Sequence, residues 1–413
     1  MRRNLSIIIL IAVFCGFNAC AKKQASIATE ETTIIKDTTY EGDNYRIGVI
    51  LPLTGRYQIY GESTLHGIEC AAGIFKPCEA NINAELIIKN DGGDAKKAAL
   101  AVEELVNEDH VSIIVGPLTS RTIAAAAKKA EDLGVPLISL SQSELVTNVG
   151  DNIFSVGMEP TGQVNSIVDW ARNSKRISRF AILYPMNRYG ELYKKLFEDA
   201  VKKSGGSIAF SDKYGETTLD FAVFFKNRKE SFDALFIPDS YKAVSHIIPT
   251  LVREEITGVQ LLGINRWNNQ ELIERGGPAV QGAVFVDGFF EKSNAMAVSS
   301  FVNTFHEGFG INPTILEAQG YDATRLAMRA LQNTGGAHPE DVRTALFSLS
   351  GVDGATGEVY FDKDRQIVRD LFLLTVSGDK IVEIQGPEKT KKTIDKYGEE
   401  IVTDPDYSND TKY

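Results

Sequence analysis

The sequence predicts an α/β fold with two doubly wound lobes, and three observations support this prediction. Short β-branched runs alternate with amphipathic helical stretches in the first part of the chain, which is typical of a parallel sheet covered by helices on both faces. The same alternation begins again after Pro160. Three helical patterns without a strand between them follow later, and these must complete a lobe that has already begun.

The first set of predicted strands ends at residue 158. Between the strands lie helical stretches such as residues 95–108, in which apolar residues recur on one face. The predicted strands are RIGVIL (46–51), ELIIKN (85–90), VSIIVG (111–116), PLISLS (136–141) and IFSVGM (153–158).

The second set of predicted strands is RFAILYP (179–185), SIAFSDKY (207–214), ALFIPD (234–239), VQLLGI (259–264) and GAVFVDGFF (282–290). Three helical patterns follow at 295–309, 314–334 and 338–349, and residues 357–384 then read as strands joined by tight turns. We therefore expect the chain to cross between the lobes three times, near residues 158, 287 and 350. Lobe 1 then contains residues 45–158 and 288–349, and lobe 2 contains residues 159–287 and 350–385.

The two ends of the chain differ from the body. Residues 1–19 combine two arginines with a short apolar run, which predicts an export signal rather than a membrane-spanning helix. The run is similar to a lipoprotein signal, in which Cys20 receives the lipid; an ordinary cleaved signal peptide is the alternative. Residues 20–44 are predicted to be a flexible tether. Residues 386–413 are predicted to be an exposed charged tail, with a short docked helix as the alternative.

Composition and cysteine usage exclude some partners. The formal net charge of −11 argues against nucleic acid, whose phosphates require a basic face. Cys70 and Cys78 are the cysteines beyond residue 20. On an unbroken helix they would lie roughly 12 Å apart, so a disulfide requires the helix to stop near Phe75. A disulfide and two free thiols both remain open, and a metal site is disfavoured because the histidines form no metal-binding spacing.

The sequence favours no enzyme class and no cofactor. The glycine-containing segment PLTGRYQIYGE (52–62) follows a predicted strand, but it matches neither the dinucleotide-binding nor the phosphate-loop pattern. The chain also lacks G-x-S-x-G and H-E-x-x-H, and its five histidines have no metal-binding spacing.

Five segments carry a family resemblance: RIGVILPLTGRYQIYGESTLHGIECA, IIVGPLTSRTIAAAAKKAEDLGVPLISLSQS, YPMNRYGE, EAQGYDATRLAM and GATGEVYFDKD. They resemble, in order and approximate spacing, the leucine/isoleucine/valine-binding protein family, the type I periplasmic solute receptors of ABC transporters. The resemblance covers about residues 45–385. It implies two lobes joined by three crossovers that close around a small molecule.

The resemblance also implies ligand-binding positions. Ser120 would meet a ligand carboxylate at a helix start, and Ser141 and Ser143 would offer a carbonyl and a hydroxyl. A helix cap or a turn is the alternative role for each serine. Tyr60 would cover the ligand and face Tyr189 of the second lobe; ordinary surface aromatics are the alternative. Two further residues are expected to face the cleft, namely Ser240 and Tyr241.

Asn265 departs from the family pattern, which usually presents a carboxylate there to the ligand's ammonium. A neutral amide loses this charge-assisted bond, and Arg266 disfavours a cation further. Asp239 or Glu317 would have to substitute. Trp267 suggests stacking on a flatter ligand, although a packed tryptophan is an equal alternative.

Two functions are therefore expected from the sequence. The first is a lipid-anchored extracytoplasmic receptor that binds an amino acid or related small polar molecule and passes it to an ABC permease. The second is suggested by residues 261–291, which resemble the family's penicillin-binding protein activators. These are outer-membrane lipoproteins that dock on peptidoglycan synthases. Both place the chain in the cell envelope, and the choice between inner and outer membrane stays open.

Overall fold

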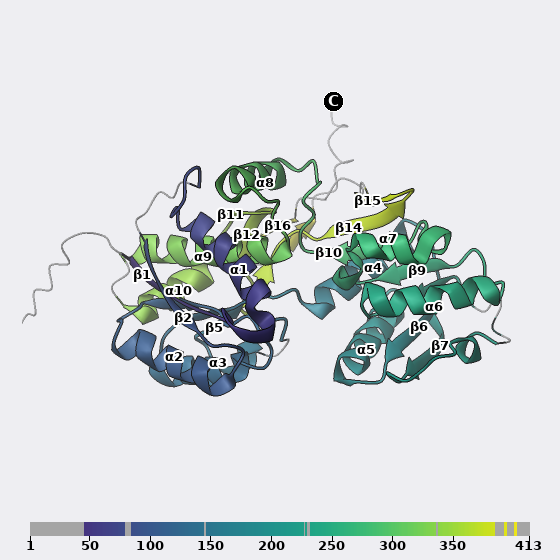
Figure 1. Ribbon diagram of the computed structural model, residues 1–413, viewed down its shortest axis with the longest axis horizontal. Helices are drawn as coiled ribbons and strands as arrows, with labels where there is room; N and C mark the ends of the chain where they lie inside the picture. Colours follow the sequence, from purple (N-terminus) through teal and green to yellow (C-terminus); the bar gives the residue numbers. More distant parts are fainter. Residues whose placement is uncertain are drawn as a thin grey trace, which may run out of the picture. The chain divides into compact units, whose positions relative to one another are not determined.

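The computed structural model describes residues 45–78, 84–143, 146–226, 228, 232–335, 338–384, 392–394 and 400–402. The predicted signal peptide, Cys20 and the tether lie outside the described residues. In the described part, the chain forms two α/β lobes, each built on its own sheet (Figure 1). No helix among these residues is long and apolar enough to cross a membrane.

Lobe 1 contains a parallel five-stranded sheet in the order β2-β1-β3-β4-β5. Its strands are β1 (Tyr45–Leu51), β2 (Ala84–Asn90), β3 (Ile113–Val115), β4 (Leu137–Ser139) and β5 (Ile153–Ser155). Strands β3, β4 and β5 are fully buried, as expected for a parallel sheet covered on both faces. The predicted β-α alternation is therefore confirmed in this lobe.

Helices cover both faces of the lobe 1 sheet (Figure 1). One face packs against α2 (Ala95–Asn107) and α3 (Ile123–Leu133). The other face packs against α1 (Gln58–Ala71) and the later helices α9 (Ile315–Thr334) and α10 (Pro339–Ser348). The late helices therefore complete the first lobe, as predicted. The remaining elements of this part are η1 (Gly55–Tyr57), η2 (Val146–Val149) and α8 (Met296–Phe309).

Lobe 2 contains a seven-stranded sheet in the order β15-β14-β10-β9-β8-β6-β7. Strands β14 and β15, the last two of this sheet along the chain, pair antiparallel with their neighbours, and the remaining pairs are parallel. The strands are β6 (Arg179–Pro185), β7 (Ser207–Tyr214), β8 (Ala234–Phe236), β9 (Gln260–Gly263), β10 (Val284–Asp287), β14 (Phe372–Ser377) and β15 (Lys380–Glu383). The helices are α4 (Pro160–Asn173), α5 (Arg188–Lys203), α6 (Tyr241–Arg253), α7 (Gln270–Gly276), η3 (Ala222–Phe224), η4 (Asn265–Trp267) and η5 (Gly277–Val280).

The predicted lobe boundary at residue 350 differs from the structure. Residues 352–368 form a small antiparallel sheet, β11 (Val352–Gly354), β12 (Gly357–Phe361) and β13 (Ile367–Val368). Its apolar side chains pack in the lobe 1 core rather than in lobe 2. The inward residues of β12 alternate with outward ones, so the hairpin buries one face against α9. The third crossover therefore follows residue 368.

Two other open predictions are resolved. Cys70 and Cys78 form a disulfide, with Cα atoms 5.1 Å apart, because α1 ends at Ala71 and frees the following chain to turn back. Within the predicted tail, β16 (Lys392–Ile394) pairs antiparallel with β17 (Glu400–Val402), in place of the helix considered from the sequence.

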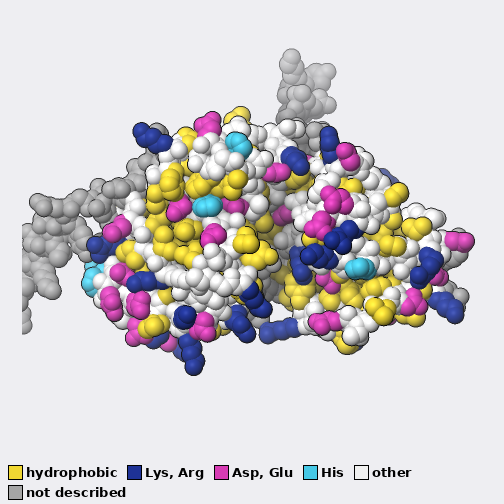
Figure 2. All heavy atoms as spheres, viewed as in Figure 1, with side chains coloured by type: hydrophobic (Ala, Val, Ile, Leu, Met, Phe, Trp, Pro, Cys, Tyr) yellow, Lys and Arg dark blue, Asp and Glu magenta, His cyan; other side chains and the backbone are white. Residues whose placement is uncertain are grey.

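Acidic and basic side chains are interspersed on the face of the molecule in Figure 2. The same view shows hydrophobic side chains over α1. Ile59 and Tyr60, in the first turn of this helix, are 76% and 53% exposed.

Glycines allow α1 to approach α9 closely. A Cβ built on Gly67 would lie 2.0 Å from the carbonyl oxygen of Glu317, and one built on Gly320 would lie 2.4 Å from that of Thr64. Both neighbours are backbone atoms, which cannot rotate away as a flexible side chain can. The two helices are therefore packed closely enough to exclude any larger residue at these positions.

The three crossovers meet around buried charged groups. Arg369, in the third crossover, donates to the carbonyl oxygen of Val156 in the first, and forms an ion pair with Asp322 of α9 at 3.5 Å. Asp287, where the second crossover begins, accepts hydrogen bonds from the Asn268 side chain at 2.8 Å and the Gly288 N–H at 2.7 Å. All three charged side chains are almost completely buried.

Burial dominates the titration of this cluster. Loss of solvation raises the pKa of Asp287 to about 7, against the opposing effect of hydrogen bonds from Asn268 and Gly288. It raises the pKa of Asp322 to about 6, against the opposing charge of Arg369. Burial also lowers the pKa of Arg369, while both carboxyls oppose that change. The place where the crossovers meet α9 thus contains two carboxyls, Asp287 and Asp322, that become charged only near neutral pH.

The close helix packing predicts that Gly320→Ala destabilises the protein. The added Cβ would collide with the backbone of α1 at Thr64, so the helices must move apart. We expect this to lower the free energy of unfolding by about 1–3 kcal/mol. Gly162→Ala in α4 is the matched control, because its Cβ would make only an ordinary contact with Leu371 at 3.6 Å. Urea unfolding should show Gly162→Ala to be neutral or slightly stabilising, since alanine favours a helix. Equal effects of the two changes would contradict the packing argument.

The raised pKa values predict that stability falls as the pH rises through neutrality. The folded state binds more protons than the unfolded chain between about pH 4 and pH 7, so the free energy of unfolding decreases over this range. In Asp287→Asn, the decrease between pH 5 and pH 8 should shrink by about 2 kcal/mol. Chemical unfolding at a series of pH values measures this, with the exposed Asp353→Asn as control. A slope as steep as that of the unchanged protein would show that Asp287 does not titrate there.

Candidate ligand-binding site

A cavity of about 660 Å³ lies where several strand ends and helix starts converge. This volume suits a small molecule. The residues that line it are Tyr57, Tyr60, Leu118, Thr119, Ser120, Arg121, Leu140, Gln142, Arg266, Leu316 and Gln319. Most come from lobe 1, and Arg266 comes from lobe 2. Two sequence-predicted residues, Tyr60 and Ser120, are thus brought together.

The turn after β1 carries the aromatic wall of this cavity. Asn90 of β2 accepts a hydrogen bond from the Leu53 N–H at 2.9 Å and donates to the Thr54 hydroxyl at 3.0 Å. A Cβ on Gly61 would lie 2.3 Å from the Pro52 carbonyl oxygen, so only glycine lets α1 start against this turn. The turn therefore leads into Tyr57 and Tyr60 at the cavity.

The loop after β3 supplies the polar end of the cavity. It begins at Gly116, whose φ of +116° and closeness to the Ile50 carbonyl oxygen both require glycine. Ser120 is exposed, and its hydroxyl accepts a long hydrogen bond of 3.4 Å from Ser141, which is fully buried. The buried serine thus supports the exposed one. Gln319 of α9 fastens this corner by donating to the Leu140 carbonyl at 2.8 Å.

The η4 turn presents Arg266 from lobe 2. The next side chain, Trp267, is fully buried and lies over Gly263, where a Cβ would be 2.2 Å from the indole. The Asn265 N–H donates to the Gln163 side chain at 3.1 Å, and Asn268 donates to Asp287. The turn that presents Arg266 is therefore anchored on both sides.

Arg266 lies among aromatic and acidic groups of lobe 2. Its guanidinium carbon is 5.6 Å from the centre of the Tyr189 ring, and its Nη1 is 3.9 Å from Oδ1 of Asp239. Asp239 accepts shorter hydrogen bonds from the Tyr214 hydroxyl and the Ser240 N–H, both at 2.6 Å. Burial raises the pKa values of Tyr189 and Tyr214, so both remain neutral hydroxyls.

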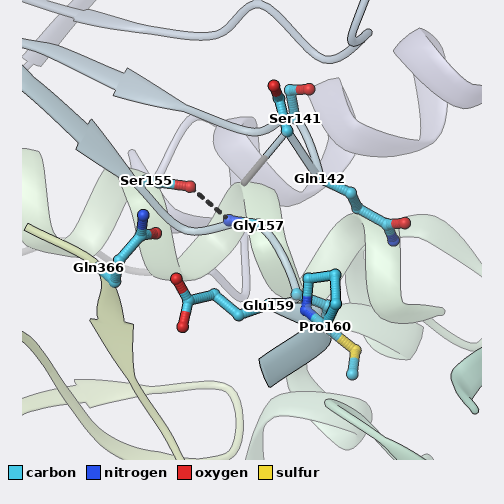
Figure 3. Close-up of a pocket in the computed structure, with 9 residues that line it drawn as sticks. Ser141, Gln142, Ser155, Gly157, Glu159, Pro160 and Gln366 are labelled. Atoms are coloured by element: carbon cyan, nitrogen blue, oxygen red, sulfur yellow. Dashed lines mark hydrogen bonds between the residues drawn. The ribbon is translucent and has the colours of Figure 1, made fainter. Parts of the chain in front are cut away.

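Other predicted residues lie outside the 660 Å³ cavity. Ser143 lines a neighbouring closed pocket with Ser141, Gln142 and Glu159. In Figure 3, the Glu159 carboxylate and Gln366 lie on one side of this pocket, whereas the Gln142 side chain points away from them. Gln142 lines both the pocket and the cavity.

The remaining predicted residues have local structural partners. Ser240 caps α6 by accepting from the Ala243 N–H at 3.4 Å, and Tyr241 donates to Glu271 at 2.9 Å. Neither they nor Asn265 and Tyr189 line the cavity. Their predicted role in ligand binding stays a prediction.

The sequence offered Asp239 or Glu317 in place of the carboxylate missing at Asn265, and it offered Trp267 as a stacking surface. Glu317 forms a capping box with Thr314 at the start of α9, so its carboxylate is used by the helix. Asp239 has the partners described above. Trp267 is packed against Phe285, which agrees with the packed tryptophan that was the alternative to ligand stacking.

Sequence reasoning did not place Arg121, Gln142 and Gln319 in the site. They come from three separate segments, and only the fold brings them together. Arg266 was noted for its charge but not as a lining residue. A signal was available for it, because it follows strand β9 at an edge where ligands bind in such sheets.

The site's chemistry is that of recognition. Hydroxyls, amides and two arginines converge on an aromatic wall. In the described part of the chain, no group of three or more His, Cys, Asp or Glu side chains is arranged to hold a metal ion. Two α/β lobes joined by three crossovers, with a cavity to which both contribute, define a bilobed binding protein.

Comparison with known proteins agrees with this class. The family model described as periplasmic binding protein matches residues 44–380, and the chain therefore belongs to that family. Family membership indicates a binding protein of the cell envelope rather than an enzyme.

The relatives found by sequence are distant. The chain is 21% identical to a Leu/Ile/Val-binding protein homologue of Brucella melitensis, over 58% of this chain and 66% of that protein. It is 20% identical to the Leu/Ile/Val-binding protein BraC3 of Rhizobium johnstonii, over 79% of this chain and 90% of that protein. The chain thus spans just under two thirds of the Brucella relative.

Solved structures share the fold over 83% of this chain. A putative branched-chain amino acid ABC transporter protein of Rhodospirillum rubrum has a TM-score of 0.76 at 20% identity and is covered completely. A substrate-binding protein of Streptococcus pneumoniae in complex with isoleucine has a TM-score of 0.64 at 21% identity and is also covered completely. A solute-binding protein of Rhodopseudomonas palustris in complex with 3,4-dihydroxybenzoic acid has a TM-score of 0.64 at 22% identity and 96% coverage.

Proposed function

We propose that this protein is an extracytoplasmic solute-binding protein of an ABC transporter, which binds an amino acid or a related small polar molecule by lobe closure. The observation that carries the proposal is the 660 Å³ cavity, whose lining joins Tyr60 and Ser120 of lobe 1 with Arg266 of lobe 2. A ligand that contacts both lobes stabilises the arrangement in which they approach, and a permease can recognise that arrangement.

Within this proposal, Ser120 receives a polar or carboxylate group of the ligand. It is exposed at the cavity, it is supported by Ser141, and it precedes α3, whose first N–H groups favour a negative group. The structural neighbours bind isoleucine and 3,4-dihydroxybenzoic acid, two small molecules that both carry a carboxylate. A carboxylate is therefore the ligand group that best suits this end of the cavity.

The second predicted function, activation of a penicillin-binding protein, rests on residues 261–291. Most of this segment has an internal role: it supplies β9, η4, α7, η5 and β10 of the lobe 2 sheet and its covering. The solute receptor therefore has the stronger support. A screen in which no solute binds, together with capture of a purified penicillin-binding protein, would favour the activator instead.

Removal of the Ser120 hydroxyl should weaken ligand binding about tenfold, because one hydrogen bond to a charged group is lost. A thermal-shift screen of the full chain against amino acids, amides and aromatic acids identifies a ligand, and calorimetry then compares Ser120→Ala with the unchanged protein. Ser300→Ala is the matched control, since Ser300 is an exposed serine that lines a different cavity beside the disulfide. Equal affinity in all three proteins would contradict the assignment of Ser120.

We also propose that residues 1–19 are an export signal, that Cys20 carries a lipid, and that residues 20–44 tether the body to the membrane. The basis is the sequence pattern, in which Ala19 precedes the cysteine. A lipid chain would hold the protein beside a membrane without a spanning helix.

Cys20→Ser should release the protein from the membrane fraction and abolish incorporation of radiolabelled palmitate. Cys15→Ser is the control, because Phe14 precedes that cysteine and does not suit cleavage. It should leave labelling unchanged. Labelled, membrane-bound protein in Cys20→Ser would show that the anchor is elsewhere.

A further inference from the structure

The geometry points to Arg266 as the specificity-determining residue of this site, selecting a small carboxylic acid without an ammonium group over an amino acid. This inference rests on the proposed solute-binding function and narrows its ligand class. Three observations carry it: the charge of the cavity lining, the use of the nearby carboxylates, and the way in which Arg266 is positioned.

The lining of the 660 Å³ cavity carries positive charge only. Arg121 and Arg266 line it, and none of its lining residues among the described part of the chain is Asp or Glu. A ligand ammonium in this cavity would lose water without gaining a carboxylate, which is a costly exchange. A ligand carboxylate would gain a charged donor instead.

The acidic groups near the cavity are already used. Glu317 accepts from the Thr314 N–H at 2.7 Å in the capping box of α9. Asp239 accepts from Tyr214 and Ser240, and it faces the guanidinium of Arg266. An ammonium that reached Asp239 would share the carboxylate with these two donors and would lie beside a fixed positive charge.

Arg266 is held in place while its charge stays available. The 3.9 Å separation from Asp239 exceeds a hydrogen bond, so the carboxylate offsets the charge without binding the guanidinium directly. Tyr189 lies near the guanidinium at 5.6 Å, and the side chain remains 46% exposed. The buried Trp267 and the bonded Asn265 fix the backbone on either side. Such pre-organisation reduces the entropy lost when a carboxylate binds.

Two matched pairs of probes test this inference with the full chain. Leucine is compared with 4-methylpentanoate, and phenylalanine with 3-phenylpropanoate, since the members of each pair differ only in the ammonium group. Calorimetry should show each acid binding at least tenfold more tightly than its amino acid. Arg266→Gln should weaken the acids about ten- to hundredfold, and it should leave the amino acids unchanged or improved, so that the preference disappears.

Arg275→Gln is the matched control, because it removes the same charge from lobe 2 at an exposed arginine paired with Glu271 outside the cavity. It should retain the preference for the acids. Thermal melting verifies that each variant is folded.

Each alternative outcome has a distinct meaning. Tighter binding of the amino acids, or equal weakening of acids and amino acids in Arg266→Gln, overturns this inference and leaves the solute-binding function intact. Absence of binding by all four probes overturns the inference alone. If the wider ligand screen also finds no ligand, the proposed solute-binding function is overturned too.

Discussion

A buried guanidinium must have a carboxylate close by, and the arrangement of this molecule depends on one such pair. Arg369 lies 3.5 Å from Asp322, with both side chains almost completely buried. Removing either partner would leave an uncompensated charge in a medium of low polarity, which costs several kcal/mol. Because Arg369 also donates to the Val156 carbonyl, the pair joins the third crossover to the first and to α9. The chain is thus constrained where it passes between lobes.

The same region positions the ligand site through η4. Asp287 of the second crossover accepts from Asn268, and Gln163, which follows the first crossover, accepts from the Asn265 N–H. These bonds hold η4 at both ends and thereby place Arg266 at the cavity. A movement of the crossovers would be transmitted to Arg266 by hydrogen bonds over a few residues. The site and the crossovers are therefore joined by hydrogen bonds, which is what the proposed coupling of ligand binding to lobe closure requires.

The two lobes and the alternation of strands and helices along the chain could be predicted from the sequence because buried parallel strands and amphipathic helices have distinct periods. The β11–β13 hairpin could not be assigned correctly, since its alternating pattern suits a half-buried strand in either lobe. Its contacts with lobe 1 decide: Asp322 of α9 accepts from the Ala355 N–H, and Arg365 donates to the Ile153 and Thr147 carbonyls. Ser120, in the loop after β3, and Tyr60, in the first turn of α1, could be placed at the cavity from the motifs. Gln319 could not, because a buried glutamine on a helix carries no signal until its partners, Leu140 and Val156, are adjacent.

Asp239 explains how a cationic site can exist without destabilising the empty protein. Its carboxylate lies near enough to Arg266 to offset the positive charge, and far enough to form no direct hydrogen bond with the guanidinium. Tyr214 and Ser240 hold that carboxylate at this distance, since both donate at 2.6 Å. A shorter pair would be satisfied internally and would compete with the ligand, whereas an isolated arginine would repel Arg121 across the cavity. The intermediate distance leaves part of the interaction to be completed by the ligand carboxylate proposed above.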